Sequence, residues 1–477
     1  MKRTKSRLVL TGAIVGAAAL ALTACGGGAS TGNGTTTDPQ SAKDAWASEE
    51  PVTISISNLP SKSNPEVRQS RLNLIADFEK EYPYITIDAQ EVTWAADTFP
   101  TMLASDTVPT LMNVPFTEMQ PMIQRGQAAD VTDYVALDDA LVNSNDSLND
   151  LAKGPEDRQY GVPMDSYSMA MYYNRALFEQ VGLDPDNPPQ TWDEVREAAK
   201  TIADGSDAQG FVFMTMDNTG GWVFTPIANG FGGRIVSEDG TEATLDDPAV
   251  TQALEFYHDL RWEDDAAGSN FLVAFDDANQ LFASGQAGMY VAPGNQFPNI
   301  VTGLGMSTED LGMAPLPQDS DGIGTLAGGT FGLISPKATP EEIAAAVKWL
   351  SFYKFRQFTD EEYAVSTAQA QVADGALVGA PAVPLVSNEL EAQWLEWVAG
   401  EINVPRENYT AYIESVTPGS ENELPLVPEP SIAAQQIYSL LDTLIQTVLT
   451  EKDADIPALL KDAQTQAQNA IDENTTE

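Results

Sequence analysis

The sequence predicts an α/β protein built as two domains. VTISIS, beginning at Val52, alternates in the β-branched pattern of a strand, and Ile85-Thr86-Ile87 is typical of a second strand. A segment with helical spacing lies between them, which makes a strand–helix–strand unit. The face of that helix is expected to carry Val67, Arg71, Leu74, Ile75 and Phe78. The chain of 477 residues exceeds what one hydrophobic core of roughly 250–300 residues supports, so two domains are expected.

The later elements follow from start and stop signals in the chain. TLMNV at 110–114 has the composition of a short strand. Thr191 with Glu194 three residues later forms a capping box, which predicts the start of a helix. A strand over 289–292 follows Gly285, where the preceding helix stops. Further helices are expected from Pro248 onward and over 275–282, 341–355, 431–450 and 456–471.

Residues 1–24 have the order of a bacterial export signal. A basic segment, 2–7, precedes the apolar stretch Leu8 to Leu22, and small residues flank Cys25, the only cysteine. The apolar stretch is short for a membrane span. LTAC resembles the bacterial lipobox, which implies a lipid of the palmitate type on Cys25 and an anchor at the extracellular face of the cell membrane. An ordinary signal peptide with an incidental cysteine is the alternative. The Gly-, Ser- and Thr-rich segment 25–50 predicts a flexible tether.

Composition argues against several classes of function. The formal net charge of −46 repels nucleic acid and anionic membrane surfaces, so neither is an expected partner. His258 is the only histidine and the lipid would occupy Cys25, so His/Cys zinc sites and Ser-His-Asp or Cys-His catalysis would all need His258. We expect His258 on a solvated helix face, with no metal, no cofactor and no catalytic residue.

Several segments, taken in their order along the chain, resemble a known family. They are YGVPMDSYSMAMYYNRALFEQVGL, PPQTWDEV, IANGFGGRI, LFASGQAGMYVAPGNQFPNI, MAPLPQ, AGGTFGLIS, PEEIAAAVKWL, LIQTVLT and IPALLKDAQTQAQNAI. Together they are similar to the extracellular solute-binding proteins of carbohydrate ABC importers, the maltose-binding-protein-like family 1. The similarity runs from Val52 to Ile471.

This resemblance implies a periplasmic-binding-protein-like (type II) clamp, with two discontinuous α/β lobes joined by a hinge. The N-terminal lobe would comprise 51–163 plus 315–358, and the C-terminal lobe 164–314 plus 359–477. The hinge would lie near Pro163 and Leu316–Leu326. Ligands of such sheets bind beyond the carboxyl ends of the strands. A ligand that contacts both lobes only when they are closed shifts the population toward closure.

A sugar site needs polar side chains around the ring edge and aromatic rings against its faces, because unmade buried hydrogen bonds cost about 1–3 kcal/mol. Such residues follow several predicted strand ends, and the resemblance implies ligand-facing aromatics near three of them. The predicted ligand-binding residues are Asn58, Lys62, Asn113, Asp165, Tyr167, Trp222, Asn295, Phe297 and Gly329.

Each of these residues has a structural alternative. Asn58 could cap its loop, Asp165 could serve the hinge, and Trp222 could belong to the core. Asn295 stands where the family often has an aromatic, and Ile432–Ala434 occupies the position of another stacking ring. Fewer stacking rings favour a ligand other than a long α-glucan.

The expected function is capture of a mono- to oligosaccharide by a monomer that delivers it to ABC transporter permease subunits, without chemistry. An extracellular lipoprotein glycoside hydrolase is the enzyme alternative, because 70 acidic residues leave carboxylate pairs available. A binding protein for a polyol, peptide or other non-sugar solute is the second alternative.

Overall fold

The strands that the structure describes form one continuous hydrogen-bonded sheet. The computed structural model describes residues 38–96 and 98–475, which belong to one compact unit. The strands are β1 (Val52–Ile56), β2 (Ile85–Ala89), β3 (Leu111–Pro115), β4 (Gly161–Asn174), β5 (Gln209–Phe211), β6 (Ala287–Pro293), β7 (Leu311–Pro315), β8 (Thr325–Ile334) and β9 (Leu426–Pro428). Their order is β2-β1-β3-β8-β4-β6-β5, with β7 beside β4 and β9 beside β8.

The helices confirm the predicted α/β class and most predicted starts. The capping box of Thr191 and Glu194 is present, and a second one joins Thr339 and Glu342. The helices are α1 (Pro39–Ala47), α2 (Pro65–Glu81), α3 (Phe99–Ser105), α4 (Phe116–Gln124), α5 (Thr132–Val135), α6 (Asp146–Asp150), α7 (Arg175–Val181), α8 (Trp192–Gly205), α9 (Thr219–Gly230), α10 (Pro248–Trp262), α11 (Phe275–Ala283), α12 (Pro340–Leu350), α13 (Glu361–Ala373), α14 (Asn388–Trp397), α15 (Thr410–Ser415), α16 (Ala434–Thr450) and α17 (Ile456–Thr475). Helix α16 starts later than predicted because Ala433 adopts a left-handed φ of 53°.

The predicted strand–helix–strand unit is present at the start of the fold. β1 and β2 run parallel, with Val52 opposite Ile85, and α2 links them. Ile75 and Phe78 are buried, whereas Val67 is 52% exposed. The buried face of α2 therefore begins later along the helix than its spacing predicts.

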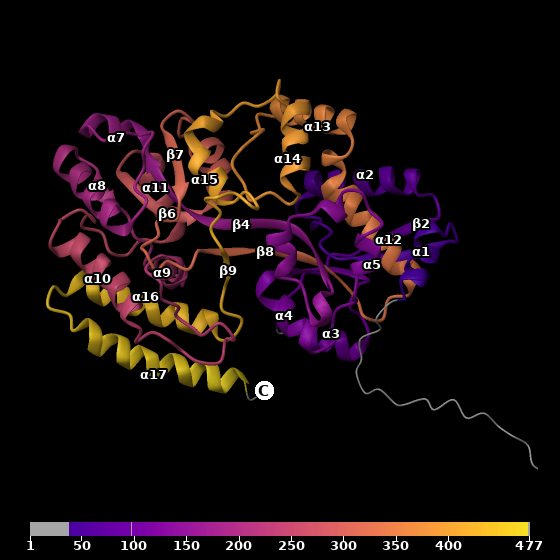
Figure 1. Cartoon of the computed structure of the whole chain (residues 1–477), viewed down its shortest axis with the longest axis horizontal. Coiled ribbons are helices and arrows are strands. Elements are labelled where there is room, and N and C mark those ends of the chain that lie inside the picture. Colours follow the sequence, from indigo (N-terminus) through magenta and orange to yellow (C-terminus); the bar gives the residue numbers. More distant parts are fainter. Residues whose placement is uncertain (1–37, 97, 476–477) are drawn as a thin grey trace, which may run out of the picture. The chain divides into compact units, whose positions relative to one another are not determined.

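Strands β4 and β8 are neighbours in the middle of the sheet and connect its two halves. Residues 161–168 of β4 pair antiparallel with β8, whereas residues 169–174 pair with β6 and β7. Figure 1 shows both strands running between the region of α4 and α12 and the region of β6 and β7. An irregularity between Pro163 and Asp165 interrupts the β4–β8 register, at the place where a hinge is predicted. Such a bulge bends a strand locally.

The predicted tether is too long at its C-terminal end. Residues 39–47 form α1, capped by Asp38, whose side chain accepts a hydrogen bond from the Gln40 backbone. Ala42 and Ala45 are buried, and α1 packs on α12 and α5. Small apolar residues at helical spacing therefore dock this segment on the fold instead of leaving it free. The predicted export signal, Cys25 and the tether up to residue 37 lie outside the described residues.

Buried apolar side chains fall into two large clusters. One contains Phe78, Tyr134 and Trp349 and holds α2, α5 and α12 together. The other contains Tyr172 of β4 and the apolar faces of α8, α9, α10 and α16, but it also includes Met119 of α4. Apolar contacts thus continue across the predicted lobe boundaries, which stay a prediction. Of the helices in residues 38–475 that the structure describes, none has the length and apolar content needed to cross a membrane.

Candidate functional site

The crossing of β4 and β8 brings three predicted site residues together. Asp165 lies opposite Thr330, whose hydroxyl donates to its carboxylate at 2.7 Å. Tyr167 lies opposite Gly328, two residues further along β4 and so on the same face of the sheet as Asp165. Gly329 has a φ of 151°, and a Cβ there would stand 2.9 Å from the Phe116 ring. Only glycine tolerates this backbone together with so close a ring.

Trp222 reaches this crossing from α9, and α16 holds α9 in place. A Cβ at Gly221 would overlap the backbone of Tyr438, so glycine permits the close approach of the two helices. The Asp442 carboxylate on α16 accepts the backbone N–H groups of Asn218 and Gly221, both at 2.8 Å. The rings of Trp222 and Tyr167 meet edge to face, with centroids 6.3 Å apart.

Glu429 links two tyrosines beside this ring pair. Tyr167 donates its hydroxyl to Oε1 of Glu429 at 2.9 Å, and Tyr438 donates to Oε2 at 3.3 Å. Burial raises the pKa of Tyr167, and the nearby Glu429 charge raises it further. Both hydroxyls therefore keep their protons and act as donors, which orients the carboxylate of Glu429.

A cavity of about 510 Å³ opens next to Glu429. It is bounded by α4, by the segment 234–240 after α9, and by β9 with the residues that follow it. The lining residues are Phe116, Thr117, Gln120, Asp150, Leu151, Arg234, Val236, Ser237, Glu238, Gly240, Ile323, Pro425, Leu426, Val427, Pro428, Glu429, Pro430 and Ser431. Walls from both predicted lobes thus line one space.

The lining combines an aromatic face with polar groups of uneven charge. Phe116 supplies a ring, stacked on Phe331 at 4.3 Å between centroids. Arg234 is the one cation among the lining residues, against the carboxylates of Asp150, Glu238 and Glu429. Such a lining can accept hydrogen bonds from hydroxyl or ammonium groups and repels anions.

Three predicted residues at the strand ends of the first lobe lie outside the cavity lining. Asn58 adopts a left-handed φ of 63°, which Asn tolerates, so a loop role explains it. Lys62 is exposed in the turn before α2. Asn113 sits in β3 opposite Gly332 and donates its backbone N–H to Ser57 at 3.1 Å.

The two predicted residues after β6 are also placed away from the cavity lining. Asn295 is exposed in a short turn, Gly294–Gln296, directly after the strand. Phe297 is 0% exposed, and its ring packs edge-on against Tyr409 with centroids 4.9 Å apart. This corrects the prediction for Phe297, because a ring without exposed surface cannot stack on a ligand in this conformation.

Sequence reasoning identified none of the cavity lining, since Asp165, Tyr167, Trp222 and Gly329 lie at the strand crossing beside the cavity and outside its lining. The segment 234–240 and the helix start at Phe116–Thr117 carry no pattern that distinguishes them from ordinary loops. Glu429 lies between Pro428 and Pro430, directly after β9, and this run of prolines marks an irregular segment. No strand is predicted at 426–428, so Glu429 is not among the polar residues expected after strand ends.

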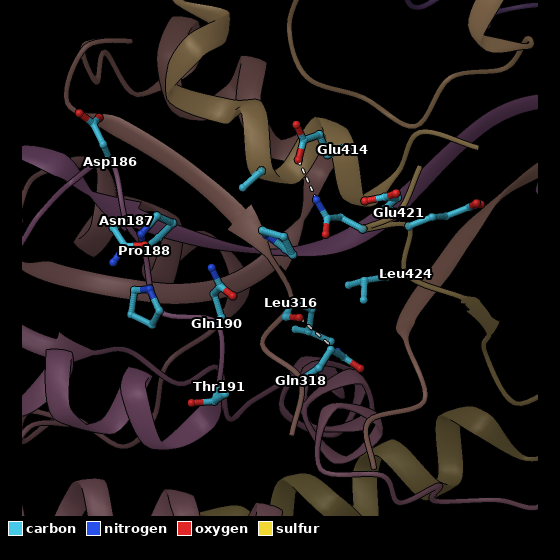
Figure 2. Close-up of a pocket in the computed structure, with 15 residues that line it drawn as sticks. Asp186, Asn187, Pro188, Gln190, Thr191, Leu316, Gln318, Glu414, Glu421 and Leu424 are labelled. Atoms are coloured by element: carbon cyan, nitrogen blue, oxygen red, sulfur yellow. Dashed lines mark hydrogen bonds between the residues drawn. The ribbon is translucent and has the colours of Figure 1, made fainter. Parts of the chain in front are cut away.

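A second cavity, also about 510 Å³, lies mostly among segments of the predicted C-terminal lobe, with Pro315, Leu316 and Gln318 from the start of the predicted segment 315–358 (Figure 2). Its walls come from the loop before α8, the residues after β7, α15 and the segment before β9. The polar groups drawn there already serve their own loops, since Gln318 donates to the Leu316 carbonyl at 3.1 Å and Glu414 accepts from Asn422 at 2.9 Å. None of its lining residues comes from 51–163. The first cavity is therefore the better candidate for a site between lobes.

The lone histidine does not contribute to either cavity. His258 on α10 donates from Nε2 to the Lys452 carbonyl at 2.8 Å and is partly buried, so its role is structural rather than that of a freely solvated side chain. Within residues 38–96 and 98–475, no group of three His, Cys, Asp or Glu side chains is placed to hold a metal ion.

Comparison with known proteins gives a family match that covers most of this fold. The family model of the bacterial extracellular solute-binding protein matches residues 63–355. Among curated proteins, the sn-glycerol-3-phosphate-binding periplasmic protein UgpB of Agrobacterium fabrum is 31% identical over 187 residues, or 37% of this chain and 40% of that protein. The match with this chain covers about 60% of the length of the curated relatives that it matches first.

Solved structures share the fold over nearly their whole length. The cyclic α-maltosyl-1,6-maltose binding protein of Arthrobacter globiformis is 23% identical, with a TM-score of 0.64 over 88% of this chain and 99% of that one. UgpB of Mycobacterium tuberculosis, solved with glycerophosphocholine, is 20% identical, with a TM-score of 0.61 over 89% of this chain and 99% of that one. At these identities the likeness establishes the type II clamp fold.

Proposed function

This chain belongs to the family of bacterial extracellular solute-binding proteins, and we propose that its solute is a mono- to oligosaccharide. In this proposal the sugar binds between two lobes and is delivered by a monomer to the permease of an ABC transporter. Lipid on Cys25 would hold the protein at the extracellular face of the cell membrane. The predicted lobe bounds, 51–163 plus 315–358 and 164–314 plus 359–477, are part of the proposal.

The observation that carries the proposal is the cavity beside the Tyr167–Trp222 ring pair. Its walls come from both predicted lobes, and its lining brings hydrogen-bond acceptors together with the mostly buried Phe116. Sugar rings present apolar faces and hydroxyl edges, which match those two features. The Tyr167–Trp222 pair lies outside the lining and reaches it through the hydrogen bond of Tyr167 to Glu429. Asp165, Tyr167, Trp222 and Gly329 remain the proposed ligand-binding residues from the sequence, joined by Phe116 and Glu429.

A phosphate-bearing solute is the alternative raised by the glycerol-phosphate-binding relatives. The cavity lining argues against it, since one arginine faces three carboxylates. Phosphate sites normally offer more donors and positive charge than this lining provides.

Calorimetric titration of the purified protein tests the proposal. A panel of mono- and oligosaccharides should include at least one saturable ligand that is recovered chemically unchanged. Glycerol 3-phosphate, glycerophosphocholine and short peptides form the comparison arm. Binding by that arm alone would overturn the proposal for a sugar, and release of smaller sugars would revive the glycoside hydrolase alternative.

A substitution then locates the site. Trp222→Ala should weaken sugar binding about tenfold or more, because it removes an aromatic face, while the melting temperature changes little. Trp397→Ala is the matched control, since Trp397 is also partly buried but packs on a separate small cluster near α13. Equal affinity losses in the two variants would place the sugar elsewhere.

A further inference from the structure

A carboxylate that no sequence pattern marked occupies the centre of the candidate site. Glu429 follows β9, which pairs with β8, while Tyr167 lies on β4, so their 2.9 Å hydrogen bond joins the crossing strand β4 to the segment after β9. The second oxygen of Glu429 accepts from Tyr438 on α16 at 3.3 Å. Three separate elements therefore set the direction of this one side chain.

The two tyrosine bonds leave part of the accepting capacity of Glu429 unused. An ionised carboxylate can accept about four hydrogen bonds, and the tyrosine hydroxyls supply two of them, one to each oxygen. Glu429 lines the cavity and is only partly buried, so the remaining lone pairs are within reach of a molecule bound there. No ion pair joins Glu429 to a cation among the described residues, which leaves its charge to act on the contents of the cavity.

The charges around the cavity favour the same kind of ligand. Asp150 and Glu238 add two more carboxylates to the lining, and Arg234 is the single cation there. A ligand with an acidic substituent would bring a like charge next to Glu429 in a partly desolvated space, where repulsion is strong. A hydroxyl or an ammonium group in that position would donate to it instead.

We propose that Glu429 is the specificity-determining residue of this site, and that it selects sugars carrying hydroxyl or amino donors over sugars carrying carboxylate or phosphate. The carboxylate contacts the ligand directly, and the hydroxyls of Tyr167 and Tyr438 position it. This inference rests on the proposed sugar-binding function and narrows its substrate class to neutral and amino sugars.

The test compares charge variants of one sugar on the purified protein. Glucose, maltose, glucosamine, glucuronate and glucose 6-phosphate are titrated by calorimetry at fixed ionic strength. Glu429→Gln keeps the size of the side chain but removes its charge, and Glu255→Gln, at an exposed position of α10 outside the cavity lining, is the matched control. Tyr438→Phe serves as a second variant that leaves the carboxylate in place.

We expect the wild type to bind a neutral or amino sugar at least about tenfold more tightly than its acidic analogue. Glu429→Gln should reduce that ratio about tenfold, Tyr438→Phe should reduce it less, and Glu255→Gln should leave it within about twofold. An unchanged ratio in Glu429→Gln, or tighter binding of glucuronate or glucose 6-phosphate by the wild type, would overturn the inference while sugar binding itself stands. Absence of binding to every sugar would overturn the proposed function, and this inference with it.

Discussion

Removal of the Asp442 carboxylate tests how the ring of Trp222 is held in the site. Asp442 is buried on α16 and accepts the N–H groups of Asn218 and Gly221, each at 2.8 Å. Asn218 occupies the N-cap position of α9 but makes no capping hydrogen bond with its own side chain. Asp442 therefore supplies the cap that α9 lacks from another helix, 224 residues further along the chain than Asn218.

The cost of Asp442→Ala follows from those two bonds. Hydrogen bonds to a charged group contribute about 1.5–3 kcal/mol each. Burial raises the pKa of Asp442 more than the backbone donors lower it, so desolvation offsets part of that gain. We expect Asp442→Ala to lower the free energy of unfolding by about 2–3 kcal/mol, and Asp442→Asn, which keeps one acceptor oxygen, by about 1–2 kcal/mol.

Urea unfolding followed by far-ultraviolet circular dichroism measures both variants. Asp453→Ala, at an exposed position after α16, is the control and should stay within about 0.5 kcal/mol of the wild type. Wild-type midpoints for both Asp442 variants, or equal losses in Asp442→Asn and Asp442→Ala, would refute the capping argument.

Two further predictions concern groups outside the site. Burial raises the pKa of Glu391 from about 4.5 to about 7, against the opposing charge of Arg406. Between about pH 4.5 and 7 the folded protein then binds more protons than the unfolded chain, so the free energy of unfolding falls as the pH rises through this range. Glu391→Gln should remove this pH dependence and be up to about 2–3 kcal/mol more stable than the wild type above pH 7. Melting temperatures of the two proteins that change in parallel with pH would contradict this prediction. Lys348 is 7% exposed and donates a hydrogen bond to the Trp46 carbonyl at 2.7 Å. Lys348→Met should therefore weaken the packing of α1, so that trypsin cleaves faster at the exposed Lys43 while the affinity for sugar stays unchanged. In the control variant Lys337→Met, trypsin should cleave at the wild-type rate.

Local patterns were sufficient for the elements and for part of the site. Alternation at Val52 and helical spacing before Phe78 predicted the first strand–helix–strand unit, and the structure contains it. Tyr167 and Trp222 were predicted as ligand-binding residues because aromatic and polar residues near strand ends are typical of a sugar site, and that role stays a prediction. Their rings do meet, although they belong to elements more than fifty residues apart in sequence.

Other predictions failed where long-range packing decides the outcome. The segment 39–47 is polar enough to suggest a tether, yet Ala42 and Ala45 pack on α12, which lies 300 residues away in the chain. Phe297 follows a strand end as a ligand-binding ring would, but Tyr409 covers it. Neither contact leaves a signal in the local sequence.

The fold class, many of the elements and the family resemblance were predictable from the sequence, because they depend on periodicity, capping residues and motifs within short windows. Which side chains share a cavity depends instead on contacts between elements that are far apart in the chain. Glu429 illustrates the difference, since its neighbours Tyr167 and Tyr438 come from β4 and α16. The direction of this carboxylate depends on hydrogen bonds from elements that are far apart in sequence, and these elements come within hydrogen-bonding distance only once the chain has folded.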